Sequence, residues 1–201
     1  MTCLKMVATI SRIQKSNSEA TMSQFSEKTL VIIKPDGVKR GLIGEIILRL
    51  ERVGLQMTDA KMVEASGDLA KAHYPITDEW LEGVGNKSLG DYQKFGLDPK
   101  NYIGTDVAKE IGHMIHEFNI KYLMSGKVLA MVWEGLHAIE IVRKIVGNTL
   151  PILAQAGTIR GDLSNDSAIV ANLEKRSIQN LVHASGSKEE AEREIELWFG
   201  N

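Results

Sequence analysis

One segment constrains this chain more than any other. Residues 29–34 (TLVIIK) are rich in β-branched side chains, and residues 35–37 (PDG) follow at once. Valine and isoleucine favour extended backbone, whereas Pro-Asp-Gly favours a turn. A short unbroken apolar run closed by a turn signal is typical of a buried strand. The segment therefore predicts a core strand that ends at Lys34.

The chain then alternates between helical and extended patterns. Apolar residues at positions 43, 46, 47 and 50 form one face of a helix that ends at Gly54. A capping box, Ser187 with Glu190, begins a last helix that runs to Phe199. The other predicted elements are a helix over 138–146 and strands over 55–64, 127–134 and 180–183. The order βαββαβ plus a final helix predicts an α+β, ferredoxin-like fold, an antiparallel sheet with helices packed on one face.

Two stretches interrupt this order and are predicted to be insertions. Residues 75–121 carry several aromatic residues and glycines, and we expect one or two helices there, the clearest ending near Tyr122. A smaller insertion over 163–177 follows a loop over 147–162. The polar, serine-rich residues 1–26 predict a flexible N-terminal leader before a single domain over 27–201.

Composition excludes several classes of protein. The formal net charge is −2, which gives no global basic field for nucleic acid or anionic membranes. The single cysteine excludes an intrachain disulfide, and no apolar run reaches the ~20 residues that span a bilayer. We expect a cytoplasmic protein. Organellar targeting by the weakly basic residues 1–18 is the alternative.

Two short motifs suggest chemistry that their context does not support. Residues 83–88 (GVGNKS) look like a phosphate-binding loop, but Asn86 separates the glycine from the lysine and no strand precedes. His113 and His116 have helical spacing, yet no third metal ligand is near in sequence, so we expect a solvated helix face.

Groups suited to phosphate binding gather at the predicted ends of elements. Phosphate handling needs cations, hydroxyls and backbone donors that converge on one place. His183 ends the last predicted strand, just before a helix N-terminus that favours anions. The other candidates are Lys34, Arg143, Thr149, Arg160, Asn180 and Ser185.

These segments resemble the nucleoside diphosphate kinase family. The matching stretches are residues 28–52 (KTLVIIKPDGVKRGLIGEIILRLER), 130–135 (AMVWEG), 141–149 (IVRKIVGNT), 156–162 (AGTIRGD) and 180–199 (NLVHASGSKEEAEREIELWF). They cover most of the chain outside the leader and the insertions. The Asn-x-x-His-x-Ser element with Glu194 downstream, beside the Gly-Thr-Ile-Arg-Gly-Asp loop, is far more specific than a lone short motif.

The resemblance implies an enzyme that passes a γ-phosphate between nucleotides in a ping-pong reaction. His183 matches the phosphorylated histidine, Glu194 the carboxylate that orients it, and Ser185 the nearby hydroxyl. Tyr74 matches the active-site tyrosine beside the γ-phosphate. Residues that hold phosphates and sugar hydroxyls are matched by Lys34, Arg143, Thr149, Arg160 and Asn180. Mg²⁺ is expected to travel with the nucleotide, without a direct protein ligand.

The residue types suit that chemistry. A neutral imidazole is a nitrogen nucleophile at pH 7, and one ring nitrogen attacks while an acceptor such as Glu194 holds the other. A lone histidine at a strand end is more often structural, but the partners of His183 stand at the family spacings. One rival hypothesis is a non-enzymatic module that binds nucleotide or a protein. The other is a nucleic-acid binder, and the low aromatic content and the net charge of −2 disfavour this second hypothesis.

The sequence also departs from the family pattern. The insertion over 75–121 obscures the apolar residue that stacks on the base, which is Ile115 by counting or Trp80 by composition. Gly186 replaces a usual acidic residue, and the usual C-terminal tail does not follow Phe199. We expect the longer insertion to be an ordered, partly helical cover over the nucleotide cleft, with packing away from the cleft as the alternative.

The resemblance also implies the partners of the protein. We expect it to bind nucleoside di- and triphosphates and to form a homo-oligomer, either a tetramer or a hexamer. We expect no membrane partner and no obligate nucleic acid.

Overall fold

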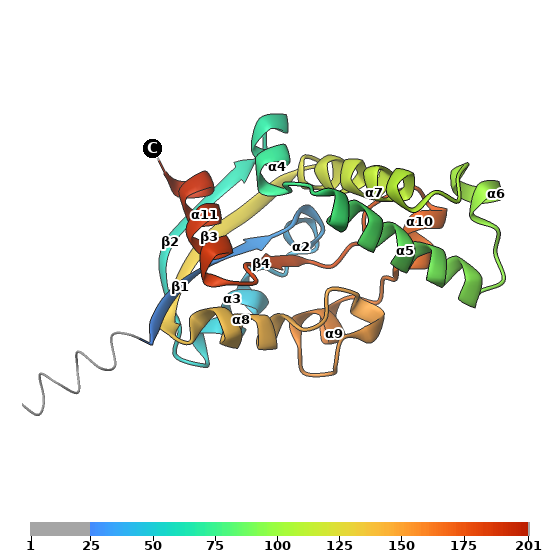
Figure 1. Cartoon of the computed structure of the whole chain (residues 1–201). Helices are drawn as coiled ribbons and strands as arrows, with labels where there is room; N and C mark the ends of the chain where they lie inside the picture. The colour runs from blue at the N-terminus through green and yellow to red at the C-terminus, as the bar shows by residue number, and fades with distance from the viewer. Residues whose placement is uncertain (1–24, 201) are drawn as a thin grey trace, which may run out of the picture.

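A four-stranded antiparallel sheet forms the centre of the molecule (Figure 1). The computed structural model describes residues 25–200. The sheet order is β2-β3-β1-β4, with β1 (Ser26–Ile33), β2 (Gln56–Glu64), β3 (Lys127–Leu136) and β4 (Val182–Ala184). The helices are α2 (Pro35–Lys39), α3 (Ile43–Glu51), α4 (Gly67–His73), α5 (Asp78–Lys94), α6 (Pro99–Ile103), α7 (Ala108–Leu123), α8 (Ala138–Val146), η1 (Pro151–Leu153), α9 (Ile159–Leu163), α10 (Ala168–Leu173) and α11 (Lys188–Phe199). The ferredoxin-like α+β prediction is confirmed.

Helices cover both faces of the sheet, so the expectation of a single covered face is wrong. On one face, Val31 and Ile33 of β1 pack with residues of α3 and α8. On the other face, Leu30 and Ile32 pack with residues of α4, α7 and α11. Side chains alternate between faces along a strand, and all four of these β1 side chains are fully buried. The unbroken apolar run of β1 is therefore explained by burial on two sides.

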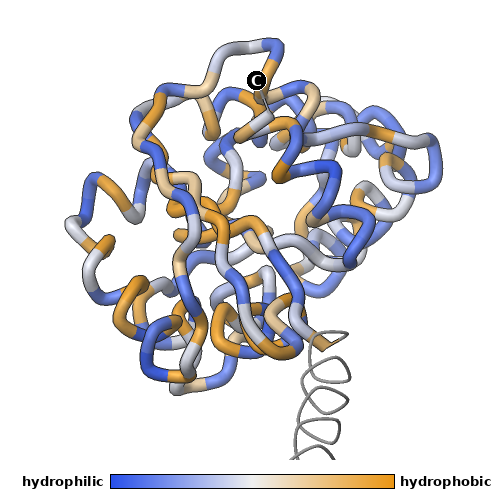
Figure 2. The backbone as a smooth tube through the Cα atoms, turned by 90° about the vertical axis from the view of Figure 1, so that its left-hand side faces the viewer, coloured by the Kyte–Doolittle hydropathy of each residue, from blue (hydrophilic) through white to orange (hydrophobic). Residues whose placement is uncertain are grey.

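Amphipathic helices make this double layer possible. Figure 2 shows hydrophobic and hydrophilic residues alternating along the helical turns. Several helices begin at a side chain that caps the first turn, and Ser187 accepts a hydrogen bond from Glu190 N at 3.2 Å as the capping box predicts. The other capping side chains are those of Ser66, Thr77, Asp98, Thr158 and Ser167.

Local boundaries differ from the prediction in several places. The segment after β1 is a short helix rather than a turn, because Pro35 suits the first helical position and Asp36 the first turn. β1 begins at Ser26, and the last strand is displaced to Val182–Ala184. The predicted loop over 147–162 contains η1 and the start of α9. Residues 1–24 of the predicted leader lie outside the described residues.

The two predicted insertions pack together into one helical lobe, made of α5, α6, α7 and α10. The first insertion holds three helices rather than one or two, and the second holds α10. A shared apolar cluster joins them, formed by Tyr92, Ile103, Ile111 and Ile169. A buried hydrogen bond of 2.6 Å from Asn172 Nδ2 to Ser88 Oγ also crosses between them. The prediction that the longer insertion is ordered and partly helical is confirmed.

Close helix packing explains the misleading glycine motif over 83–88. This motif lies inside α5, and a Cβ atom added to Gly85 would overlap the Ala108 carbonyl of α7. Gly112 of α7 approaches the backbone of Leu81 in the same way. These glycines let two helices meet backbone to backbone, so the motif serves packing rather than phosphate binding.

Within residues 25–200 no helix is both long and apolar enough to cross a bilayer.

Candidate active site

A strained turn presents His183 at the edge of the sheet. Leu181 is fully buried and has a φ of 67°, unusual for a branched side chain, and its neighbours close a tight turn by a 2.7 Å hydrogen bond from Val182 N to Asn180 O. Leu181 O also accepts from Lys34 N at 2.8 Å. The turn thus fixes the start of β4 against the end of β1. His183 then lies opposite Ile32 in the sheet register.

A chain of hydrogen bonds sets the tautomer of His183. Leu30 N donates to Ser185 Oγ at 3.3 Å, and Ser185 Oγ donates to Glu194 Oε2 at 2.7 Å. His183 Nε2 lies 2.8 Å from the same carboxylate oxygen. A carboxylate accepts only, so Nε2 carries the ring proton and Nδ1 keeps its lone pair. The fourth strand and the last helix therefore hold an imidazole ring whose Nδ1 atom keeps a lone pair.

The surroundings of His183 favour the neutral ring. Burial lowers the pKa of His183, and the positive charge of Lys34 lowers this pKa further. Burial raises the pKa of Glu194, while the hydrogen bond from Ser185 and the positive charge of Arg193 oppose that rise. The His183 side chain is still 16% exposed, whereas that of Glu194 is 1% exposed. The imidazole of His183 is thus reachable from solvent, whereas the carboxylate that contacts it is not.

Lys34 lies at the beginning of α2 in a largely buried position. Its Nζ donates to Asn180 Oδ1 at 2.8 Å and lies 5.4 Å from the centre of the Tyr122 ring. Burial, with the nearby charge of Arg160, lowers the pKa of Lys34 to about 7. An anion that binds next to this buried ammonium would stabilise its charged form.

Arg160 is tied to the backbone around the site. Its Nε, Nη1 and Nη2 donate to the carbonyls of Asn180 at 3.1 Å, Gly147 at 2.9 Å and Val182 at 2.5 Å. Burial, with the nearby charge of Arg143, lowers its pKa to about 10. The residue is only 4% exposed, so it joins the α8–η1 connection to the catalytic strand.

The remaining predicted residues border this centre. Asn180 Nδ2 donates to Thr149 O at 2.9 Å, so the structure brings the Thr149 backbone into the network while its hydroxyl makes no described hydrogen bond. Arg143 is exposed and donates weakly to Ala184 O, at 3.4 Å. Tyr74 follows α4, and burial, followed by the negative charge of Glu194, raises its pKa.

Sequence reasoning missed His73 and misjudged His116. His73 is 2% exposed, its ring centre lies 4.4 Å from that of His183, and its only sequence signal is its place beside Tyr74. His116 is 9% exposed rather than on a solvated face, because its Nε2 bonds Tyr74 O at 2.9 Å. This bond joins α7 of the helical lobe to the end of α4.

The two residues proposed for base stacking lie in different surroundings. Ile115 packs against the apolar cluster of the helical lobe, while Trp80 is 38% exposed and stands edge-on to His116. Both therefore stay candidates.

The described residues contain one group with metal-ligand spacing, His73, His183 and Glu194. This group is rich in nitrogen and mostly buried, whereas Mg²⁺ prefers oxygen ligands and keeps several waters. Gly186 offers no side chain, and its N–H donates to the Glu190 carboxylate. These three side chains are therefore a poor match for the ligands that Mg²⁺ prefers.

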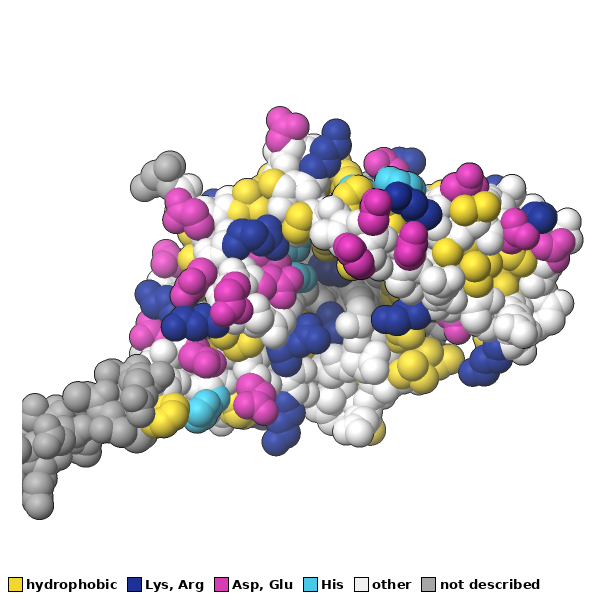
Figure 3. All heavy atoms as spheres, viewed as in Figure 1, with side chains coloured by type: hydrophobic (Ala, Val, Ile, Leu, Met, Phe, Trp, Pro, Cys, Tyr) yellow, Lys and Arg dark blue, Asp and Glu magenta, His cyan; other side chains and the backbone are white. Residues whose placement is uncertain are grey.

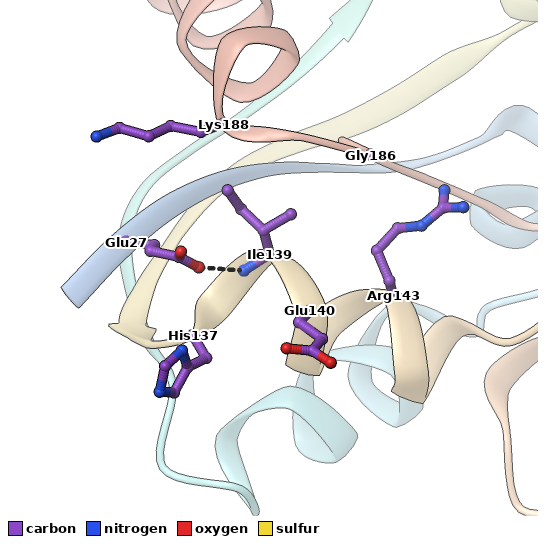
Figure 4. A pocket seen from close by; sticks show the side chains of 7 residues that line it. All are labelled: Glu27, His137, Ile139, Glu140, Arg143, Gly186 and Lys188. Atoms are coloured by element: carbon purple, nitrogen blue, oxygen red, sulfur yellow. Dashed lines mark hydrogen bonds between the residues drawn. The ribbon is translucent and has the colours of Figure 1, made fainter. Parts of the chain in front are cut away.

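Charged side chains of both signs border the site. In Figure 3, Lys and Arg side chains lie in and below the hollow in the middle of the visible face, and Asp and Glu side chains lie along its upper rim. An open pocket of about 360 Å³ flanks this region, and Figure 4 shows Arg143 extending past Gly186 at one end of it. At the other end, Glu27 Oε2 accepts from Ile139 N at 3.2 Å.

Comparison with known proteins identifies the family. Residues 27–80 and 107–201 match the family described as nucleoside diphosphate kinase. A nucleoside diphosphate kinase of Pyrobaculum aerophilum is 52% identical over 173 residues, which cover 86% of this chain and 94% of that protein. Nucleoside diphosphate kinase A of Rattus norvegicus is 38% identical, over 87% of this chain and 86% of its own.

Solved structures agree with the sequence relatives. The crystal structure of an NDP kinase from Pyrobaculum aerophilum aligns with a TM-score of 0.83 at 50% identity, covering 87% of this chain and 96% of that one. A nucleoside-diphosphate kinase from Borrelia burgdorferi, described as a transition state mimic with bound vanadate and ADP, aligns with a TM-score of 0.68 at 38% identity and 88% coverage of both chains. The family match includes the strands, helices and loops that build the site around His183, and the chain belongs to the nucleoside diphosphate kinase family.

Proposed function

We propose that this member of the family transfers the γ-phosphate of a nucleoside triphosphate to a nucleoside diphosphate through a phosphohistidine on His183. One observation carries the proposal most directly. Glu194 holds Nε2 of His183 at 2.8 Å, which leaves the Nδ1 lone pair free, and the positive charges of Lys34, Arg160 and Arg143 act on this ring.

Phosphoryl transfer then occurs in two matched steps. In the first, Nδ1 of His183 attacks the γ-phosphorus, the bond from that phosphorus to the bridging oxygen breaks, and the nucleoside diphosphate leaves with the bond electrons. The ring becomes cationic, and Glu194 stabilises this charge through Nε2–H. In the second step, a terminal oxygen of another nucleoside diphosphate attacks the phosphohistidine, and Nδ1 leaves as a neutral nitrogen.

The other residues act by position and charge. The transition state of phosphoryl transfer spreads negative charge over the equatorial oxygens, so fixed positive groups supply most of the stabilisation. Lys34 and Arg143 take this role, with the Tyr74 hydroxyl beside the γ-phosphate. Thr149 and Asn180 hold phosphate and sugar oxygens, and Arg160 keeps the loop and strand in register while its remaining N–H groups face the phosphates. A Mg²⁺ ion carried by the nucleotide phosphates would neutralise part of their charge.

The experiment follows the phosphoryl group itself. The enzyme is incubated with γ-labelled ATP, and then with GDP after removal of free nucleotide. We expect label to enter an acid-labile protein adduct and to leave as GTP. His183→Ala should abolish both steps while circular dichroism stays unchanged, because alanine supplies no nucleophile. Nucleotide binding without an adduct in the wild-type protein would instead support a non-enzymatic binding module.

Little discrimination among bases is also expected. The polar residues assigned here address phosphate and sugar, and stacking on an apolar surface tolerates every base. Values of kcat/KM for ADP, GDP, CDP and UDP should therefore agree closely. A preference above roughly a hundredfold, near 2.7 kcal/mol, would require hydrogen bonds to the base edge and contradict the prediction. A cytoplasmic location and a homo-oligomeric state complete the proposal.

A further inference from the structure

His73 is a buried polar side chain next to the nucleophile that the proposed phosphoryl transfer does not use. It ends α4, and its side chain is 0% exposed. Its ring stands edge-on to His183, with an interplanar angle of 79°, and edge-on to Trp198 at 88°. His73 thus lies between the catalytic ring and the last helix.

Hydrogen bonding fixes the tautomer of His73. Trp198 Nε1 lies 3.3 Å from His73 Nδ1, and an indole nitrogen can only donate. Nδ1 is therefore an acceptor, and the proton of the neutral ring is on Nε2. Burial lowers the pKa of His73, and its neighbour His183 lowers it further, which agrees with a neutral ring.

His73 keeps a buried polar atom that an apolar side chain of the same shape would not have. Its Nε2 is buried and has no hydrogen-bond partner within the described part of the chain. A buried donor without a partner destabilises the folded state, and a phenylalanine of similar shape would avoid that cost. A polar ring is present all the same, with Nδ1 placed 3.6 Å from Glu194 Oε1.

The lone pair of Nδ1 has a directional effect on that carboxylate. Oε1 cannot accept a hydrogen bond from an atom that is itself an acceptor, and its described donor is Arg193 Nη2, at the long distance of 3.5 Å. The two short contacts, with His183 at 2.8 Å and Ser185 at 2.7 Å, fall on Oε2. The edge of the His73 ring also limits rotation of the His183 imidazole. Both effects keep Nδ1 of His183 free and aimed into the site.

We propose that His73 is a positioning residue for phosphoryl transfer, which orients the Glu194 carboxylate and the His183 ring without touching the nucleotide. The proposal rests on the proposed phosphohistidine mechanism. Positioning errors of about 1 Å reduce rates by about a hundredfold, so the loss of such a contact should be visible in the chemical step.

Three variants separate the chemistry of His73 from its shape. His73→Phe keeps a ring but removes the acceptor. His73→Asn places an oxygen near the position of Nδ1 and can still accept from Trp198. Trp198→Phe leaves His73 in place but removes the donor that fixes its tautomer. His113→Phe, at an exposed position of α7, is the matched control for the loss of a histidine.

The measurements are the rate of His183 phosphorylation by ATP, the KM values, and ¹⁵N chemical shifts of the His183 ring. We expect His73→Phe to slow phosphorylation about ten- to a hundredfold with KM changed less than about twofold. Its ring shifts should move from the Nε2–H form towards a mixture of tautomers. Trp198→Phe should show the same changes to a smaller degree, and His73→Asn should restore most of the rate.

An unchanged phosphorylation rate in His73→Phe would overturn the inference, as would a raised KM with unchanged kcat. If this variant fails to fold, Trp198→Phe and His73→Asn decide the question by the same criteria. The tautomer of His183 is measured without nucleotide. Absence of a phosphohistidine in the wild-type enzyme would therefore refute the proposed function, whereas an unaltered tautomer in the variants would refute the role of His73 alone.

Discussion

Lys34 lies in surroundings that oppose its charge, and this has a measurable consequence. Its pKa of about 7 compares with 10.5 for an ordinary lysine. Unfolded chains therefore hold more protons than the folded protein between about pH 7 and 10.5. Over that window the contribution of Lys34 to the free energy of unfolding rises with pH. Below pH 7 Lys34 is protonated in both the folded and the unfolded protein, so the whole cost of burying its charge lowers the free energy of unfolding.

Nucleotide binding should raise the pKa of Lys34 again. Phosphate oxygens favour the ammonium form, so binding at pH 8 should take up close to one proton per site, and much less at pH 6. Isothermal calorimetry of ADP binding in buffers of different ionisation enthalpy measures this uptake. Lys34→Arg is the matched control, because arginine stays charged throughout and should bind without the proton. Equal uptake by both proteins would exclude Lys34 as the source.

The two arginines near the site should differ in their effect on stability. Arg160 is buried and donates to three backbone carbonyls, of which only that of Asn180 also accepts another described hydrogen bond, from Val182 N. Arg160→Ala removes all three bonds and should lower the free energy of unfolding by about 3 kcal/mol or more. Arg143 makes one weak contact and is exposed. Arg143→Ala should change stability by less than about 0.5 kcal/mol while reducing activity. Urea unfolding compares them, and equal destabilisation would contradict the assignment.

At the scale of elements, the helical lobe depends on the close crossing of α5 and α7. Gly85→Ala would place a Cβ against the Ala108 backbone, which cannot withdraw as a flexible side chain can. We expect a loss of about 1–3 kcal/mol. Gly83→Ala in the same helix meets nothing within 4 Å and should stabilise it by up to about 1 kcal/mol. Thermal unfolding of the two variants tests this, and a Gly85→Ala protein as stable as wild type would show that the helices move apart freely.

The same lobe tests the idea of a cover over the nucleotide cleft. α7 packs on the sheet through Ile120 and Leu123, and Ser177 Oγ donates to Asn119 Oδ1 at 2.6 Å just before the catalytic strand. Replacing residues 84–108 with a short Gly-Ser linker removes most of α5 and all of α6. A cover predicts a raised KM for every nucleotide in this shortened protein. If the shortened protein folds and its KM and kcat are unchanged, the helical lobe takes no part in nucleotide binding.

At the scale of the whole molecule, one of the two edges of the sheet is a nine-residue strand with a single neighbour among the described residues. β2 lies at that edge, and Met57 and Met62 are 40% and 44% exposed. A long exposed edge strand is a template for association. Together with the family resemblance this predicts a homo-oligomer, tetramer or hexamer, in which the loop over 149–157 meets a neighbour. Light scattering at micromolar concentration measures the state, and a monomer would refute the prediction.

The sequence determined the features that depend on near neighbours in the chain. The apolar run of β1, the period of α8 and the Ser187 cap are local patterns, and each predicted its element. The nucleophile and its partners were predictable because Asn180, His183, Ser185 and Glu194 lie within one short motif and its following helix. The predicted roles of these residues stay to be tested, but the structure places them within one network of contacts.

Tertiary structure decided what no local pattern encodes. A period shows which face of a helix is apolar but not which surface meets it, so both the covering of the sheet on two faces and the union of two insertions into one lobe were missed. Lysine and arginine look alike in sequence whether buried or exposed, so only packing distinguished Arg160, with its three carbonyls, from Arg143. His73 gave no signal beyond its place beside Tyr74, because its partners, Trp198 and Glu194, come from the far end of the chain. Burial and the partners of a polar atom arise from contacts distant in sequence, and these set the tautomer and the pKa on which the chemistry depends.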